Sequence, residues 1–248
     1  MKITYIHHSS FLIELETMTL LFDYTEGVLP EIRRDKPLLV FASHRHGDHY
    51  SEKVLDLIRE YKGIRYIFSD DIWRSGLPAE VLGDITSMKP GQEQKFWFEN
   101  ESVLENPLKD KEADIQVVTY RSTDEGVAFL IKAEGKTLYH AGDLNNWYWE
   151  GEPADWNANM AKDYSAEIDK MKGMEIDVAF LPLDPRQEEA FCLGLDEFMR
   201  KVCVSHVFPM HLWGDFSVIA KLKEMEISAP YRERIEDIKK DGDCYLVD

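Results

Sequence analysis

Short apolar segments, separated by charged residues, glycine and proline, recur along the chain. Runs of this length, bounded by residues that favour turns, are typical of β-strands. The strands predicted in this way are residues 3–6, 11–15, 20–22, 38–42, 66–68, 94–98, 115–120, 127–133, 137–140, 178–181, 204–208 and 244–247. The pattern therefore predicts a chain dominated by β-structure, with the last strand at the edge of a sheet.

Other segments show the spacing of three to four residues between apolar positions that is typical of a helix. The helices predicted are a segment after the N-cap residue Ser51 (apolar at 54, 55, 58 and 61), a segment with apolar positions 160, 164, 168 and 171, and residues 195–202 and 216–225. We interpret the stripe at 160–171 as core. A loop rich in tryptophan, asparagine and glycine, residues 143–156, precedes it.

Two β-rich halves, each closed by helices, predict an α/β protein with a four-layer α/β/β/α sandwich. No internal repeat, low-complexity tract or long linker interrupts the sequence. We therefore expect residues 1–248 to form a single domain.

Composition and charge narrow the classes of function. No apolar run approaches the roughly 20 residues of a membrane span, the first residues lack the apolar core of a signal peptide, and three scattered cysteines suggest no disulfide framework. We therefore expect a cytoplasmic protein with no membrane partner. With 47 acidic and 29 basic residues the net charge is −18, which argues against a nucleic-acid partner.

The densest chemistry lies directly after the apolar segment 38–42. His44, His46, Asp48 and His49 form the spacing H-x-H-x-D-H. Imidazoles crowded in this way repel one another when protonated, so such a cluster usually implies a cation that keeps them neutral. A chance histidine-rich loop is the alternative. The position between a buried strand and a helix favours a metal site, because both neighbours are rigid.

Two later strand ends offer further ligands. Asp143 follows the strand at 137–140, although Gly-Asp-x-Asn is also ordinary turn chemistry, and His211 follows the strand at 204–208. His140 differs from Asp143 by an odd number of residues, so in a regular strand the two would face opposite ways. We expect His140 in the core or behind the ligands. His206 is interpreted as structural, and His8 as a further candidate for lining the pocket.

This ordered set resembles the metallo-β-lactamase superfamily. The segments 6–14 and 139–143 resemble its branch of L-ascorbate-6-phosphate lactonase-like, metal-dependent hydrolases. The resemblance implies the αβ/βα fold with metals at one edge of the paired sheets. It also implies the ligands: the first metal takes His44 and His46, the second takes Asp48, His49 and His211, and Asp143 bridges them.

The family pattern expects a third histidine for the first metal shortly before the Gly-Asp strand. The matching segment here contains no histidine, and Arg121 or a neighbour occupies the expected place. We therefore expect unequal sites, with the first metal held more weakly. An inward Arg121 would compete with that metal. In the other arrangement Arg121 turns outward and Asp124 or Ser122 helps.

The function that the resemblance implies is hydrolysis of a small-molecule ester, lactone or phosphoester by a metal-bound hydroxide. One or two divalent transition metals, zinc first and manganese or iron as alternatives, would lower the pKa of a bound water to about 7. Asp48 is the candidate catalytic residue, because it would orient the nucleophile or accept its proton. Tryptophans of the 147–156 loop and Trp213 are candidates for the pocket wall. Arg186 would pair either with a substrate anion or with Asp184.

Three other readings follow from the same residues. A ribonuclease of this superfamily is disfavoured by the charge of −18 and by the lack of an evident basic insertion. A di-iron reductase would usually carry a carboxylate in the place of His46. The serious alternative is a non-catalytic, metal-dependent binding or sensor protein whose site has decayed at Arg121.

Overall fold

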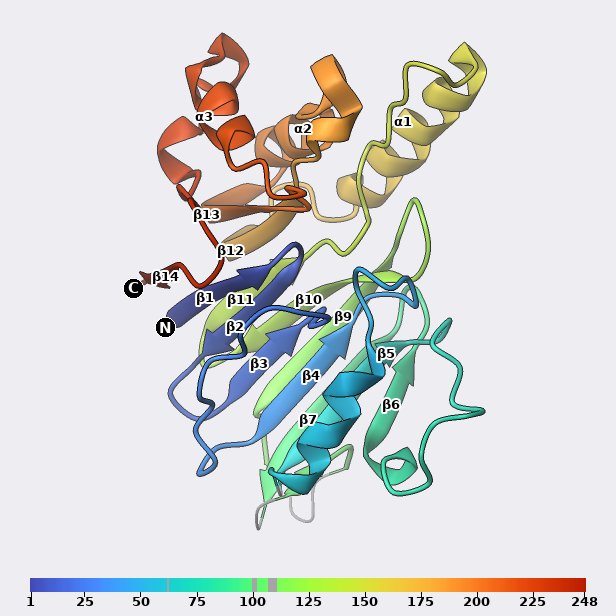
Figure 1. Ribbon diagram of the computed structural model, residues 1–248, viewed down its shortest axis with the longest axis vertical. Coiled ribbons are helices and arrows are strands. Elements are labelled where there is room, and N and C mark those ends of the chain that lie inside the picture. Colours follow the sequence, from blue (N-terminus) through green and yellow to red (C-terminus); the bar gives the residue numbers. More distant parts are fainter. Residues whose placement is uncertain (62, 100–101, 107–110) are drawn as a thin grey trace.

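The computed structural model describes residues 1–61, 63–99, 102–106 and 111–248. Within these residues the chain forms two β-sheets of seven strands each, which pack against one another (Figure 1). The first sheet has the order β14-β1-β2-β3-β4-β5-β6 and the second has the order β13-β12-β11-β10-β9-β7-β8. The predicted α/β sandwich is thereby confirmed.

The first sheet is antiparallel from β14 to β3 and parallel from β3 to β6. Its strands are β1 (Lys2–His7), β2 (Ser10–Glu14), β3 (Thr19–Phe22), β4 (Leu38–Ala42), β5 (Ile64–Ser69), β6 (Ile85–Met88) and β14 (Cys244–Leu246). Strands β3 and β4 are buried along their whole length, as expected of parallel strands that are covered on both faces. The short 3₁₀ helix η1 (Glu52–Arg59) packs on this sheet, and the Ser51 hydroxyl caps it as predicted, accepting from the Lys53 amide at 3.4 Å.

The second sheet is parallel over β11, β12 and β13 and antiparallel elsewhere. Its strands are β7 (Glu93–Glu99), β8 (Ser102–Leu104), β9 (Ile115–Arg121), β10 (Val127–Ala133), β11 (Lys136–His140), β12 (Glu175–Pro182) and β13 (Cys203–Met210). The helices α1 (Ala154–Asp169), α2 (Leu193–Lys201) and α3 (Ser217–Glu224) lie on the β12 and β13 side (Figure 1). Short 3₁₀ turns complete the described elements: η2 (Leu82–Asp84), η3 (Pro185–Ala190), η4 (Glu226–Ser228) and η5 (Arg232–Arg234).

Alternation along the strands divides the core into two clusters. Phe11 and Ile13 of β2 face the second sheet and belong to the large cluster, whereas Leu12 between them belongs to a smaller cluster with Val54 and Leu55 of η1. This is the period of two expected of a strand that is buried on both faces. The layers therefore run in the order η1, first sheet, second sheet, α-helices.

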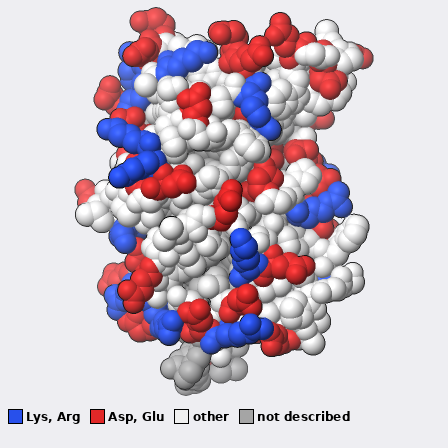
Figure 2. Space-filling view, viewed as in Figure 1, with Lys and Arg blue, Asp and Glu red and all other residues white. Residues whose placement is uncertain are grey.

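The structure adds two strands that the apolar pattern does not predict, β6 and β8. Within the described residues, no helix is long and apolar enough to cross a membrane. On the face shown in Figure 2, acidic side chains are spread widely, and basic side chains stand singly or in small groups among them.

Phe180 of β12 provides a test of the core between the sheets. Its ring lies 4.4 Å from that of Phe11 and 5.5 Å from that of Phe208, and its side chain is fully buried. We predict that Phe180→Ala lowers the free energy of unfolding by about 3–5 kcal/mol, because it removes buried apolar surface and leaves a cavity. Urea denaturation measures this. Val28→Ala, at a position that is 88% exposed, should change stability by less than about 0.5 kcal/mol; equal effects would contradict the assignment.

Candidate metal centre

Segments far apart in the sequence bring their polar side chains together where strands end. The turn between β1 and β2 carries His8, the loop after β4 carries the H-x-H-x-D-H cluster, and the turn between β9 and β10 carries Asp124. Asp143 follows β11 and His211 follows β13. Among the described residues these side chains form two groups of four, in each of which the potential ligand atoms all lie within 4.8 Å of one another.

The first group, called here the imidazole-rich group, consists of His8, Asp48, His49 and His211. The Asp48 Oδ2 atom lies 3.5 Å from His8 Nε2, 3.9 Å from His49 Nε2 and 3.7 Å from His211 Nε2. The three imidazoles are buried and Asp48 is one-third exposed. This group contains the three residues predicted for the second metal and adds His8.

The second group, called here the mixed group, consists of His44, His46, Asp124 and Asp143. His44 Nε2 lies 3.1 Å from His46 Nδ1 and 3.5 Å from Asp143 Oδ2, and His46 Nδ1 lies 3.6 Å from Asp124 Oδ2. It contains both histidines predicted for the first metal. Arg121 is exposed to solvent, which is the outward arrangement of the two considered for it.

Asp143 lies between the two groups. Its Oδ1 atom is 3.1 Å from His49 Nε2 and 3.4 Å from His211 Nε2, while its Oδ2 atom faces His44. One carboxylate oxygen therefore points to each group. This is the position that a bridging ligand requires, as the sequence predicts for Asp143.

Four buried ring or carboxylate atoms in these groups have no hydrogen-bond partner. They are His8 Nε2, His49 Nε2, His211 Nε2 and Asp143 Oδ1. A buried polar atom without a partner costs about 1–3 kcal/mol, and four of them facing one space indicate a missing cation. Imidazole nitrogens and carboxylate oxygens are the ligands that divalent transition metals take in proteins, so the residues present fit such a metal.

The ring nitrogens that face away from the groups do have partners. These pairs are His49 Nδ1 with Asp23 at 2.7 Å, His211 Nδ1 with Asp184 at 2.9 Å, His44 Nδ1 with the Ser43 hydroxyl at 3.1 Å and His46 Nε2 with Glu125 at 3.4 Å. Metal-ligating histidines characteristically donate their second N–H in this way, which fixes the tautomer and the ring orientation. The arrangement leaves the inward nitrogens of His49 and His211 without a hydrogen bond, whereas those of His44 and His46 share one with each other at 3.1 Å.

Burial and neighbouring charges shift the pKa values of the site in different senses. Burial acts to lower the pKa of His49 and of His211, but Asp143 outweighs it and raises both, so a metal would have to displace protons from these two rings. Burial lowers the pKa of His44 to about 4 and also lowers the pKa of His8, so both rings are neutral near pH 7. Burial acts to raise the pKa of Asp143 and of Asp48, but the neighbouring imidazoles outweigh it and hold both pKa values well below the ordinary range. Neutral imidazoles and ionised carboxylates are the forms that bind metal.

The backbone at the site is held in unusual conformations. His8, Asp23 and His211 have φ values of 52°, 43° and 63°, in the left-handed region that residues other than glycine seldom adopt. Such residues cost of order 1–3 kcal/mol each and gather at functional sites. The surrounding structure therefore fixes the direction of two candidate ligands and of the carboxylate behind a third.

Two glycines allow the strand ends to approach closely. A Cβ atom at Gly126 would lie 2.0 Å from the Ser43 carbonyl oxygen, and one at Gly142 would lie 2.6 Å from the Ser43 Cβ. Both also have positive φ. Only glycine permits this contact, which sets the turns carrying Asp124 and Asp143 against the loop carrying His44.

The remaining residues singled out in the sequence have other places. His140 is buried, with its Nε2 atom 3.0 Å from the Ser9 carbonyl oxygen, in the core as expected. His206 pairs with Glu236 at 2.7 Å, outside both groups. Arg186 pairs with Asp184 through two nitrogens, and its guanidinium lies 4.2 Å from the centre of the Trp213 ring.

A cavity of about 320 Å³ opens onto the two groups. Besides His46, Asp48, Asp124, Asp143 and His211, its lining includes Trp147, Trp149, Trp156, Met160 and Arg186. The tryptophan loop therefore forms a wall of the cavity. Met160 also faces it, so the interpretation of the whole 160–171 stripe as core was wrong at this residue, whereas Tyr164, Ile168 and Met171 are buried in the core.

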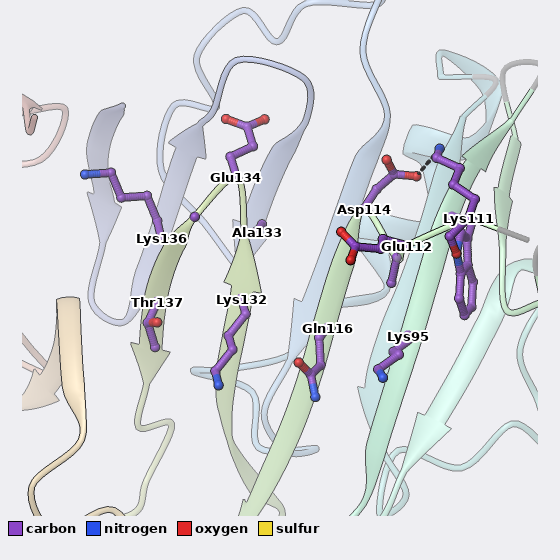
Figure 3. Close-up of a pocket in the computed structure, with 13 residues that line it drawn as sticks. Lys95, Lys111, Glu112, Asp114, Gln116, Lys132, Ala133, Glu134, Lys136 and Thr137 are labelled. Carbon is purple, nitrogen blue, oxygen red and sulfur yellow. Dashed lines mark hydrogen bonds and ion pairs between the residues drawn. The ribbon is translucent and has the colours of Figure 1, made fainter.

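A second hollow, of about 590 Å³, lies at the opposite ends of the same strands. Thr137, Lys132, Gln116 and Lys95 form a row there across four paired strands, with the Lys111–Asp114 ion pair beside them (Figure 3). Charged and polar side chains make up most of its lining, and none of the described lining residues has a buried polar atom without a hydrogen-bond partner. Among the described residues, both candidate metal groups lie at the smaller cavity and not at this hollow.

Comparison with known proteins agrees with this geometry. Residues 2–152 match the family described as β-lactamase superfamily domain, and the chain belongs to this family. A protein of Alkaliphilus metalliredigens named "UPF0173 metal-dependent hydrolase" is 26% identical over 246 residues, which cover 90% of each chain. One of the same name from Hyperthermus butylicus is 28% identical over 57% of this chain and 60% of its own length. The alignment thus spans less than two thirds of that second relative.

A solved structure has the same fold over nearly its whole length. The structure of Igni18, described as a novel metallo hydrolase from Ignicoccus hospitalis, covers 98% of this chain and 97% of its own, with a TM-score of 0.57 and 18% sequence identity. At this identity the likeness establishes the metallo-β-lactamase fold alone.

The carboxylates behind the ligands provide a test. We predict that Asp184→Asn and Asp23→Asn each weaken metal binding about 10–100-fold, because the amide orients His211 or His49 less firmly and makes the ring less basic. Competition with a chromophoric chelator measures the affinity. Asp241→Asn is the matched control, since Asp241 pairs with the exposed His7 at 2.8 Å, and it should change nothing. A loss in the control equal to that in the two variants would refute the role.

Proposed function

We propose that this protein is a metal-dependent hydrolase that acts on a small-molecule ester, lactone or phosphoester. The observation that carries the proposal is the set of four buried potential ligand atoms that make no hydrogen bond and face one space beside a cavity. Its relatives are named metal-dependent hydrolases, in agreement with this chemistry. A cavity of about 320 Å³ suits a small molecule.

The two groups are proposed to hold divalent transition metals, with zinc, manganese and iron as the candidates. Such ions, when bound, polarise an acyl or phosphoryl oxygen and lower the pKa of a coordinated water. His44 and His46 belong to one site, His49 and His211 to the other, and Asp143 would connect them. Hydrogen bonds on the outer side of the rings fix the orientation of His44, His49 and His211.

Asp48 is proposed to act on the proton of the attacking water. Its carboxylate lies in the cavity, is partly exposed and is held ionised by the adjacent His211 and His8. It can therefore orient a water molecule and accept a proton at Oδ1 or Oδ2. The tryptophan wall offers an apolar surface to the substrate in the same cavity. Arg186 forms an ion pair with Asp184, so its positive charge is largely offset.

The first test is metal content. We predict one to two equivalents of zinc, manganese or iron per chain after growth in medium supplemented with these metals, measured by elemental analysis. A chelator should remove them and abolish turnover, and added metal should restore it. Protein that contains no transition metal and takes up none on titration would end the proposal.

The second test is a substrate panel of lactones, carboxylic esters, thioesters and phosphodiesters. His49→Ala should abolish hydrolysis of whichever class is turned over, because it removes a ligand that also contacts Asp143. His206→Ala serves as the control, since His206 lies outside both groups, and should retain full activity. Unchanged turnover in His49→Ala would contradict the assigned role.

A further inference from the structure

We propose that Asp124 is a metal ligand that replaces the missing third histidine, and that it makes the mixed group selective for a harder metal than the imidazole-rich group. The inference rests on the proposed metal-dependent function. It concerns the position where the sequence departs from the family pattern and Arg121 turns to solvent.

The position of Asp124 is that of a ligand. Its Oδ2 atom lies 3.6 Å from His46 Nδ1, and its nearest ligand atom is within 4.8 Å of those of His44, His46 and Asp143. Its side chain is 44% exposed and lines the cavity. The other carboxylate of the group, Asp143, is buried, and its Oδ2 atom faces the same space at 3.5 Å from His44 Nε2.

The turn that carries Asp124 is fixed in place. The Asp124 amide donates to the Ser122 hydroxyl at 3.1 Å, and the Thr123 hydroxyl donates to the Asn145 carbonyl at 2.6 Å. The Val127 amide donates to the Ser43 carbonyl at 2.9 Å, beside the close contact at Gly126. These bonds tie the turn to both loops that supply the other members of the group. A turn held in this way pre-organises its carboxylate.

Glu125, the adjacent carboxylate, has a different role. It accepts two hydrogen bonds from Arg45, at 2.8 and 2.7 Å, and lies near the outward Nε2 atom of His46. The inward Nδ1 atom of the same ring faces Asp124 and His44. Asp124 is therefore placed as the ligand and Glu125 as the group that orients His46.

The two groups consequently differ in donor type. The mixed group offers two imidazoles and two carboxylates, whereas the imidazole-rich group offers three imidazoles and one carboxylate. Carboxylate oxygens suit manganese, and imidazoles suit zinc. Affinity for zinc generally exceeds that for manganese at any one site. We therefore expect the mixed group to prefer zinc over manganese by a smaller factor than the imidazole-rich group does.

The test loads the full chain with one equivalent of zinc and then with excess manganese, followed by desalting. Elemental analysis gives the metal content, and electron paramagnetic resonance reports bound manganese independently of activity. Wild type should retain one zinc and one manganese per chain. Asp124→Ala should retain zinc and lose manganese, and Asp124→His should retain a second metal but bind zinc there when both metals are offered.

Asp35→Ala is the control and should retain both metals, because Asp35 is exposed, pairs with Arg33 and belongs to neither group. If Asp124→Ala retains zinc, the variant is folded. If it loses zinc, the metal content of Asp124→His tests the role of Asp124 instead. The proposal is overturned if Asp124→Ala keeps the wild-type manganese signal, if Asp124→His takes up manganese as the wild type does when both metals are offered, or if Asp35→Ala loses manganese as well. Wild-type protein that binds neither metal would refute the proposed function itself, whereas metal binding indifferent to Asp124 would refute only this inference.

Discussion

The site depends on one electrostatic constraint: a buried carboxylate must be met by compensating charge. Asp143 is only 5% exposed, and an uncompensated ion at such depth costs several kcal/mol. Imidazoles from the loop after β4 and from the end of β13 surround it. Because these elements belong to different sheets, the two sheets must pack in one register for Asp143 to be accommodated. The packing of the two sheets and the charge balance of the site therefore depend on each other.

The close packing that this requires is provided by small residues and ordered turns. Glycines at 126 and 142 let backbone approach Ser43, and Asp23 ties Ser43 to His49 by accepting from the Ser43 amide and hydroxyl. The candidate ligands His44, His49 and His211 are thus held by buried polar side chains behind them, Ser43, Asp23 and Asp184. Rigid support of this kind keeps donor atoms in place before any ion arrives.

Much of the fold and part of the site could be predicted from the sequence. Continuous apolar runs such as 38–42 identify strands buried on both faces, and the ordered motif identifies six side chains that the structure brings together. Strand β6 was not predicted, because a four-residue segment with two polar residues at its centre carries little apolar signal. Asp124 and His8 lie in turns, where carboxylates and histidines are common, and only the tertiary packing distinguishes them. Their ligand roles, like those of the six, are proposals that the experiments above address.

The left-handed backbone of His8 and His211 has an evolutionary consequence. At such positions glycine or asparagine relieves strain, so drift without selection would replace both histidines and gain stability. An imidazole is retained there only while its ring is needed. Among relatives of this chain, the residue types at these two positions should therefore distinguish lineages that retain the metal centre from lineages that keep the fold but have lost it.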